Sequence, residues 1–239
     1  MDKKPYTGKV YLIPTLLAPN THDKVLTVQV EEMIQQIKFF FVENIRTARR
    51  FISSLKLGIV IENLHFIELH KKTTIADIQK EAQVVFKGQD VGILSEAGCP
   101  AIADPGHLLV AWAHKRDIQV VPLIGASSIL LALMASGFNG QQFIFHGYLP
   151  IKAPERTKAL QQIEKEAYKK KQTQIFMETP FRNNQLLNSI LQTCDASTQL
   201  CIASNLTSQQ EFIKTRTIND WKKQLPDLHK QPTLFLLYP

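Results

Sequence analysis

SEAGCPAIADPG, residues 95–106, is the most informative stretch of this sequence. It follows VGIL at residues 91–94, an apolar run typical of a short buried strand, and an apolar helical pattern begins at Leu108. Two glycines, two prolines and two carboxylates in twelve residues fix a backbone shape and let a ligand approach the main chain. Because ligands of open α/β sheets bind at the carboxyl ends of strands, the stretch predicts a ligand-binding loop rather than an ordinary tight turn.

A second loop of similar composition, VPLIGASS at residues 121–128, follows another short strand. Upstream of it, β-branched or apolar runs alternate with helical patterns. We expect strands at 9–14, 39–42, 66–69, 91–94 and 118–122, and helices at 25–37, 45–55, 74–86, 106–115 and from 127 or 128 to 135. Thr73 or Thr74 is suited to cap the third helix, with Asp77 in its first turn, and Gly137 to end the last one. This alternation predicts a mostly parallel sheet covered by helices.

The turn signal Asn139-Gly140 separates this half from a second set of elements. There we expect strands at 142–147, 173–177, 199–203, 211–217 and 233–238, and helices at 154–170, 181–191 and 217–223. The sequence therefore predicts two α/β domains, residues 1–138 with a mostly parallel sheet and residues 139–239 with a mixed one. No long linker separates them, so the groove between the domains is the expected ligand site.

Several protein classes are disfavoured by composition. The longest apolar run, Ile129–Ala135, is too short to cross a membrane, and the first residues lack the apolar core of a secretion signal. Cys99, Cys194 and Cys201 have neither metal-knuckle nor redox-pair spacing, which favours a reduced, cytoplasmic protein without a metal site. The chain contains no G-x-G-x-x-G motif and no P-loop motif, which argues against a dinucleotide dehydrogenase and a P-loop enzyme.

The formal net charge of +7 and a pI of about 9.3 are the main indication of a partner. The basic residues gather in two clusters: Arg46, Arg49, Arg50 and Lys56, and Lys165, Lys169, Lys170 and Lys171. Such clusters suit a polyanion because each neutralised phosphate releases counterions. Either cluster alone could equally be a solvated helix face. Two clusters on a strongly basic chain favour nucleic acid.

Five separated segments resemble, in the right order, the tetrapyrrole-methylase-like S-adenosylmethionine-dependent methyltransferases. They are residues 10–15, 95–106, 121–128, 145–150 and 177–182. Within that family the chain is most similar to the branch that methylates a ribose 2′-hydroxyl of small-subunit ribosomal RNA. The resemblance implies two α/β domains with S-adenosylmethionine in the cleft between them, commonly in a homodimer.

Carried over by position, the resemblance also implies the cofactor-binding residues. They are Leu16, Leu17, Glu96, Ala97, Gly98, Cys99, Ser127, Ser128, Ile129, Met177, Pro232 and Thr233. Glu96 stands where the family usually has aspartate, and the loop after the first strand lacks the family's glycine. Apolar walls, backbone groups and a carboxylate together suit an adenosyl ligand.

Three residues at or beyond the ends of predicted strands are candidates for catalysis: Glu43, Arg46 and His70. A ribose hydroxyl must lose its proton during methylation, so a base or polarising group should lie nearby. Glu43 could accept that proton, Arg46 could hold a phosphate, and His70 could do either. Alternatively, Glu43 is only a carboxylate favoured by a helix dipole, and His70 a surface loop residue.

Two further acidic residues have mainly structural expectations. Asp104 is expected to shape its loop by binding backbone amides. Glu178 and Arg182 are expected to form a structural pair, with a functional role as the alternative. Two other functions remain open beside RNA methylation: methylation of a tetrapyrrole or another small molecule, whose carboxylates would also suit the net charge, and RNA binding without catalysis.

Overall fold

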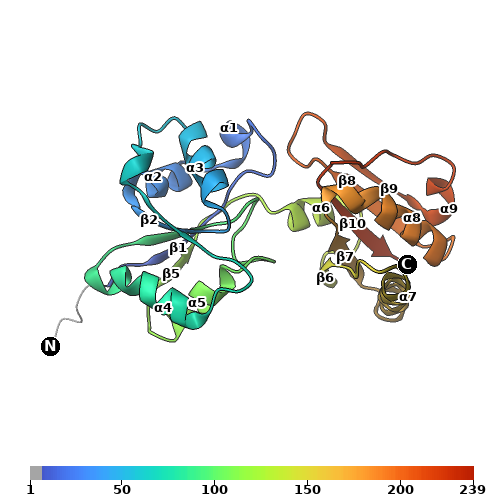
Figure 1. The fold of residues 1–239 in the computed structure, drawn as a ribbon. Helices are drawn as coiled ribbons and strands as arrows, with labels where there is room; N and C mark the ends of the chain where they lie inside the picture. The colour runs from blue at the N-terminus through green and yellow to red at the C-terminus, as the bar shows by residue number, and fades with distance from the viewer. Residues whose placement is uncertain (1–6) are drawn as a thin grey trace. The chain divides into compact units, whose positions relative to one another are not determined.

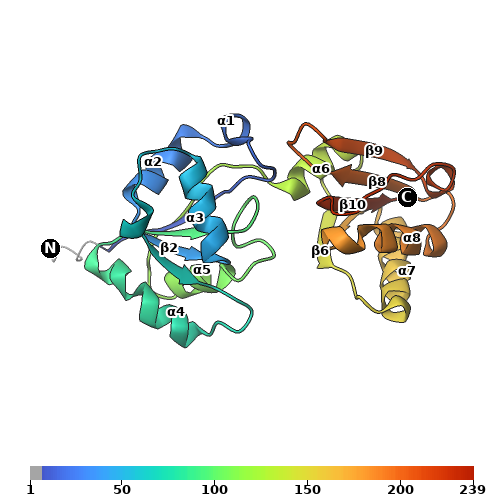
Figure 2. The ribbon, with the colours of Figure 1, turned by 45° about the horizontal axis from the view of Figure 1, so that its top comes forward.

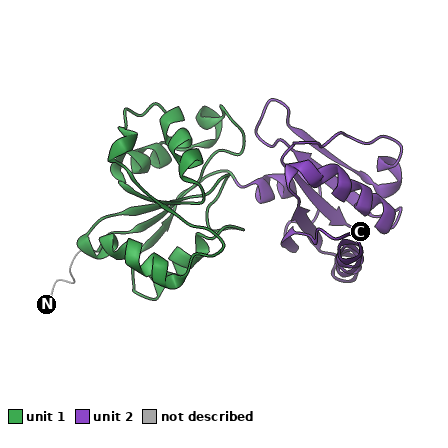
Figure 3. Cartoon of the chain, viewed as in Figure 1, with its two compact units in different colours: residues 1–126 green, residues 127–239 purple. Residues whose placement is uncertain are grey.

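The computed structural model describes residues 7–239 and forms two compact α/β units, Met1–Ala126 and Ser127–Pro239 (Figure 3). This boundary lies before helix α6 (Ser128–Ser136), whereas the sequence places it after that helix. The reason is tertiary, because α6 packs on strands of the second sheet. Thr215 Oγ1 in that sheet donates a hydrogen bond to the Ser136 carbonyl oxygen over 2.7 Å.

The first unit contains a five-stranded sheet in which the strand order is β3-β2-β4-β1-β5. The strands are β1 (Val10–Ile13), β2 (Phe39–Val42), β3 (His65–Glu68), β4 (Val91–Leu94) and β5 (Val120–Pro122). All of its strand pairs are parallel, which confirms the parallel sheet that the alternating pattern predicts. A parallel sheet brings the carboxyl ends of its strands to one edge, so their loops meet there.

Helices cover both faces of this sheet, with α2 and α3 on one side and α4 and α5 on the other (Figure 1). The helices are α1 (His22–Val25), α2 (Val28–Gln36), α3 (Ile45–Ser54), α4 (Ile75–Glu81) and α5 (His107–His114), with 3-10 turns η1 (Ile61–Asn63) and η2 (Ala82–Lys87). The expected helix 25–37 is broken, because Thr27 accepts a hydrogen bond from Val30 N and starts α2 anew. The expected helix 74–86 ends in the tighter η2.

Two helix ends follow the sequence closely. Thr74 Oγ1 accepts from Asp77 N, and the Asp77 carboxylate accepts from Thr74 N in return, so the pair forms a capping box. Gly137 ends α6 with a φ of +78°, in the left-handed region that glycine adopts at low cost. Both features depend on neighbouring residues alone.

The second unit contains a mixed five-stranded sheet in the order β6-β7-β10-β8-β9. The strands are β6 (Phe143–Tyr148), β7 (Thr173–Met177), β8 (Gln199–Ser204), β9 (Phe212–Thr217) and β10 (Thr233–Tyr238). Only β6 and β7 are parallel, and the other pairs are antiparallel. The predicted mixed sheet is therefore confirmed. Its remaining helices are α7 (Ala153–Lys170), α8 (Asn183–Thr193) and α9 (Ile218–Trp221), with the 3-10 turn η3 (Pro180–Arg182).

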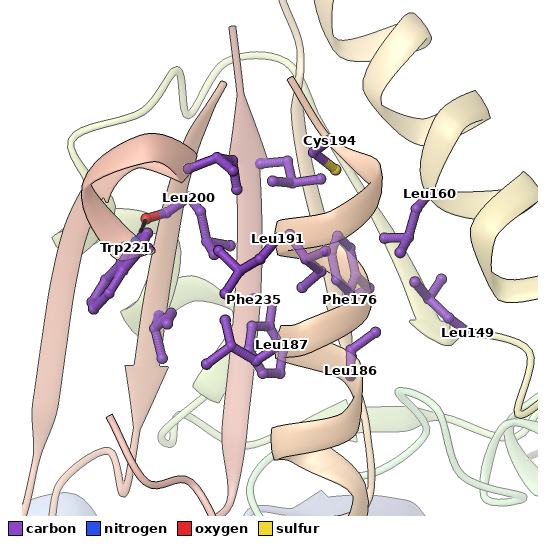
Figure 4. Packing of buried hydrophobic residues seen from close by; sticks show 14 of the residues in the cluster. Leu149, Leu160, Phe176, Leu186, Leu187, Leu191, Cys194, Leu200, Trp221 and Phe235 are labelled. Atoms are coloured by element: carbon purple, nitrogen blue, oxygen red, sulfur yellow. Dashed lines mark hydrogen bonds between the residues drawn. The ribbon is translucent and has the colours of Figure 1, made fainter. Parts of the chain in front are cut away.

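Helices α7 and α8 pack on the face of this sheet away from α6 (Figure 2). Leucines from α8 meet aromatic residues of the strands, and Phe176 stacks on Phe235 with 6.1 Å between ring centroids (Figure 4). Trp221 is buried, and its indole N–H donates to the Leu200 carbonyl oxygen over 2.8 Å. Each unit thus has a core of its own. Within residues 7–239, no helix has the length and apolar character needed to span a bilayer.

Candidate functional site

Three loops meet at the carboxyl edge of the parallel sheet, after β1, β4 and β5. These strands are neighbours, so their ends lie side by side. Thr15 N donates to the Gly98 carbonyl oxygen over 2.9 Å, which joins the first two loops. The Cys99 thiol lies 3.4 Å from the Ala126 carbonyl oxygen, which joins the second and third. The chain leaves β1 towards β2 and leaves β4 towards β5, and such a reversal of direction is where open α/β sheets bind ligands.

The loop 95–106 has an unusual backbone. Gly98, Ala101 and Ala103 have φ values of +72°, +66° and +65°. Non-glycine residues in that region cost of order 1–3 kcal/mol each and gather at functional sites. Asp104 supports the shape, because its carboxylate accepts from Gly106 N over 2.7 Å, as the sequence predicts. Burial raises the pKa of Asp104 above its usual value.

Two glycines let these loops approach one another. A Cβ at Gly98 would lie 3.0 Å from Leu17 Cδ2 and 3.1 Å from the Ala126 carbonyl oxygen. A Cβ at Gly125 would lie 2.2 Å from Pro14 Cβ, closer than real atoms approach. The small residues therefore have a packing reason, and they leave main-chain groups near the surface for a ligand.

A pocket of about 430 Å³ opens within the first unit between the loops after β1 and β4 and helix α3. It is lined by Thr15, Leu16, Leu17, Ala18, Pro19, Asn20, Thr47, Ala48, Arg50, Phe51, Ser54, Ser95, Glu96 and Ala97. Four of the residues that the resemblance assigns to cofactor binding are thus brought together here, namely Leu16, Leu17, Glu96 and Ala97. The volume lies in the range of small-molecule sites.

Glu43, which follows β2, is held beside this pocket. Its Oε1 accepts a hydrogen bond from Glu96 N over 2.9 Å. Burial raises the pKa of the Glu43 carboxyl group, and the negative charges of Asp104 and Glu96 raise it further, against the opposing effect of the hydrogen bond. A carboxylate with a raised pKa is a stronger base than an ordinary one, so the structure gives Glu43 a chemical property that suits proton abstraction.

The other two catalytic candidates lie in different surroundings. Arg46 is exposed on α3, in the first turn after the cap formed by Asn44. His70 is exposed after β3, and its Nδ1 accepts from Lys72 N over 3.1 Å. It lines a separate pocket of about 420 Å³ together with Asp77 and Glu81. In the described residues no hydrogen bond or shared pocket joins His70 to Glu43.

The remaining cofactor candidates belong to the second unit and fall at two places. Ser127 caps α6 by accepting from Leu130 N, and Ser128 and Ile129 form the first turn of that helix. Met177 ends β7 and is half-buried, and its partner across the ladder, Leu234, directly follows Thr233 at the start of β10.

Pro232 precedes Thr233, so these residues lie at the same end of the sheet as Met177. The Thr233 hydroxyl is already bonded, to Ser204 Oγ at 3.0 Å and to the Gln231 carbonyl oxygen at 2.9 Å. Its side chain therefore has an established structural task in this strand.

Glu178 and Arg182 form the expected pair, with 2.6 Å between Oε1 and Nη2. Burial of Glu178 disfavours its charged form, but the hydrogen bonds from Arg182 and from Thr179 N outweigh it and lower the pKa of the carboxyl group. An acid held in its charged form by two donors is a structural anchor rather than a base.

Several pocket residues belong to no sequence motif that would identify them as site residues. Thr47, Arg50, Phe51 and Ser54 line the pocket from α3, and only Arg50 stands out earlier, as a member of a basic cluster. Their spacing of three and four places them along one helical face, which is the local signal that could have found them. Among the described residues, no group of three or more His, Cys, Asp or Glu side chains is arranged to hold a metal ion.

Comparison with known proteins identifies the family of this chain. Residues 22–221 match the family described as Tetrapyrrole (Corrin/Porphyrin) Methylases. The chain belongs to this family. The match includes α3, the loop 95–106 and most of the second unit, so the methylase domain spans both sheets.

Several relatives that match most of the chain have the name "Ribosomal RNA small subunit methyltransferase I". The protein of that name from Streptococcus pyogenes serotype M6 is 31% identical over 219 residues, covering 92% of this chain and 71% of the relative. The one from Buchnera aphidicola subsp. Acyrthosiphon pisum is 29% identical over 222 residues, covering 92% and 74%. The one from Escherichia coli O157:H7 is 29% identical over 222 residues, covering 91% and 73%.

Solved structures agree on the fold. The methyltransferase CobJ aligns with a TM-score of 0.62 at 15% identity, covering 97% of this chain and 94% of its own. The native form of uroporphyrin III C-methyltransferase from Thermus thermophilus aligns with a TM-score of 0.58 at 14% identity, covering 97% of each chain. The family match and the names of the relatives together show that this member of the tetrapyrrole methylase family is a methyltransferase.

Proposed function

We propose that this methyltransferase uses S-adenosylmethionine to methylate a ribose 2′-hydroxyl of small-subunit ribosomal RNA. The observation that carries the proposal is the position of Glu43. Its carboxyl group has a raised pKa and lies beside a pocket with one wall formed by α3, a helix whose charged residues are all arginines. The names of the relatives favour ribosomal RNA as the acceptor. The proposal includes a cytoplasmic location, with the three cysteines as free thiols, and a homodimer, as the family resemblance implies.

The loops of the first unit fit an adenosyl donor. Gly98 and Gly125 bring main-chain atoms of two loops together where larger side chains would clash. Ala97 and Cys99 add small side chains, and Glu96 adds a carboxylate for hydroxyl or ammonium groups. In the second unit, the proposal assigns donor contacts to Ser127, Ser128, Ile129, Met177, Pro232 and Thr233.

S-adenosylmethionine, when bound, supplies an electrophilic methyl carbon on a sulfonium sulfur. Positioning of the acceptor oxygen contributes most of the acceleration in such a displacement, so the protein acts mainly by holding the acceptor. Glu43 accepts the proton that the ribose hydroxyl releases as its oxygen gains the methyl group. Arg46 lies within the first turn of α3 and holds a phosphate, whereas His70 is assigned to orient RNA at the edge of the site.

The direct test is methyl transfer by the purified protein. Small ribosomal subunits from a strain lacking this activity are incubated with methyl-labelled S-adenosylmethionine, and the product nucleosides are mapped. We expect label in a 2′-O-methyl nucleoside. Calorimetry with S-adenosylmethionine is run in parallel. Donor binding without label in RNA would refute the proposed acceptor, and label in an added porphyrinoid would assign a tetrapyrrole substrate instead.

A further inference from the structure

We infer that the pocket between the loop 15–20 and α3 is the acceptor subsite, which receives one unpaired nucleoside of the RNA while Arg50 contacts a neighbouring phosphate. The inference rests on the proposed function and adds to it a place for the acceptor within the first unit. Size, lining, charge and the position of Glu43 each support it.

The pocket suits the shape of a nucleoside. Its volume of about 430 Å³ lies at the lower end of the range for small-molecule sites, which fits a base and its ribose. Pro19, Ala48 and Phe51, none of them assigned to the donor, offer apolar surface for the flat faces of a base. Proteins that read RNA by sequence commonly take bases out of unpaired segments and stack them on such surfaces.

Polar side chains surround this apolar surface. Asn20, Thr47 and Ser54 line the same pocket. Asn20 can donate or accept hydrogen bonds, whereas the hydroxyls of Thr47 and Ser54 donate to Asn44 Oδ1 and to the Phe51 carbonyl oxygen and can still accept from a base or a ribose hydroxyl. A mainly apolar pocket with a few polar groups is the usual form of a specific site, because the polar groups set the orientation. The lining thus supports one ordered nucleoside rather than a smooth hydrophobic ligand.

The charge of α3 distinguishes the acceptor from the donor. The helix sequence, IRTARRFISS, contains three arginines and no acidic residue, and all three arginines are exposed. Arg50 lines the pocket, whereas Arg49 lies 3.7 Å from Glu62 and is not part of the lining. A cationic wall repels a sulfonium donor and attracts a polyanion, so RNA is the ligand that this charge favours.

The chemistry of the site lies next to the pocket. Glu96 forms part of its lining, and the backbone N–H of Glu96 holds the Glu43 carboxylate at 2.9 Å. A nucleoside in the pocket would therefore lie beside the proposed base. It would also lie against the four lining residues that are assigned to the donor, Leu16, Leu17, Glu96 and Ala97. One pocket thus explains how the acceptor meets both groups.

The inference is tested by placing a larger side chain in the pocket. Ser54 and Ser53 are neighbouring exposed residues near the end of α3, but only Ser54 lines the pocket. We expect Ser54→Phe to weaken binding of a short fluorescein-labelled single-stranded RNA about tenfold or more, the size of a lost base contact. The affinity of Ser54→Phe for S-adenosylmethionine should stay within about twofold of the wild-type value. The matched control Ser53→Phe should bind both RNA and S-adenosylmethionine within about twofold of wild type, because surface changes have small effects.

A second pair of variants tests the phosphate contact. Arg50→Ala should weaken RNA binding and reduce the slope of log affinity against log salt by about one. Arg49→Ala should change that slope less, since Arg49 already has Glu62 beside it. Neither change removes a buried side chain, so this pair remains informative if Ser54→Phe fails to fold.

The outcomes separate this inference from the proposed function. If wild-type protein methylates RNA but Ser54→Phe and Arg50→Ala bind it normally, the acceptor lies elsewhere and only the inference fails. If Ser54→Phe loses S-adenosylmethionine rather than RNA, the pocket holds the donor and the inference is overturned. If wild-type protein binds S-adenosylmethionine but no RNA, the proposed function fails as well.

Discussion

The pKa values of carboxyl groups shift in opposite directions in two regions: the loops after β2 and β4 of the parallel sheet, and the second unit with its mixed sheet. In the first unit, burial raises the pKa values of Glu43 and Asp104 at the loops after β2 and β4, whereas the capping hydrogen bonds with Thr74 lower the pKa of Asp77 at the start of α4. In the second unit, hydrogen bonds and ion pairs lower the pKa values of several carboxylates. These are Glu166, Glu178, Asp195, Asp220 and Asp227.

The difference follows from strand direction. A parallel sheet places successive loops at one edge, where acidic groups from distant segments crowd together and lose water. In an antiparallel ladder, successive ends alternate, and each loop satisfies its own polar groups. Asp195, for example, accepts from Ser197 N over 2.8 Å and from Ser197 Oγ over 2.7 Å within a single turn. The comparison indicates that crowded loops such as those after β2 and β4 can hold a carboxyl group with a raised pKa, whereas locally bonded carboxylates in both units have structural roles.

The largest expected effect tests the reactive side of this comparison. Glu43→Gln should lower kcat about 10²–10⁴-fold, because a positioned base contributes that much. Glutamine keeps an acceptor for Glu96 N, so the fold should be retained. Single-turnover methyl transfer, with unfolding curves as the control, measures the effect. Unchanged kcat would remove Glu43 from the mechanism.

The acid limb of the wild-type pH–rate profile is a second test of Glu43 as the catalytic base. The pKa of this group is raised, so activity should fall on acidification at a pH above the usual range for a glutamate. The limb should be lost in Glu43→Gln. A limb that persists in the variant would assign the titration to another group.

A packing change should have a smaller effect, and a different one in each unit. Gly125→Ala should lower stability by about 1–3 kcal/mol, because its Cβ would lie 2.2 Å from Pro14 Cβ. Gly140→Ala in the second unit meets no atom within 4 Å, so its effect should stay within about 0.5 kcal/mol. Urea unfolding measures both. Equal effects would mean that the loops after β1 and β5 are not tightly packed.

Glu178→Gln tests the structural side. In the wild-type protein, the pKa of Glu178 is lower in the folded state than in the unfolded state. The Glu178 carboxylate should therefore stabilise the fold fully above its unfolded pKa, and this stabilisation should fade as the pH falls through its folded pKa. We expect a loss of about 1–3 kcal/mol at neutral pH, since Arg182 loses its charged partner, and little difference in strong acid. Unfolding at several pH values measures it. A loss independent of pH would contradict the ion-pair account.

The smallest effect should be shared by both units. Thr74 and Thr217 each accept a hydrogen bond from the backbone N–H of an aspartate three residues later, at the start of α4 and α9. Replacing either threonine by alanine should cost about 1 kcal/mol. Thermal unfolding compares the two. Similar losses would show that local caps are equivalent and that the units differ only in how their loops meet.

Local patterns predicted many elements correctly. The bounds of β2, β4, β7 and β10 agree with the sequence, as do the Thr74 cap and the Gly137 end of α6. Each depends on residues a few positions apart, because side-chain periodicity and turn conformation are local properties. The Asp104 contact with Gly106 was predictable for the same reason.

The sequence by itself therefore determined most of the elements, the parallel character of the first sheet and the character of the loop 95–106. Tertiary structure decided that Glu43 meets Glu96, fifty-three positions away, that His70 lines another pocket, and that α6 belongs to the second unit. It also decided that α3 completes the pocket with loops after β1 and β4. Such contacts depend on strand order and on which face a helix covers, and neither is encoded in the spacing of neighbouring residues.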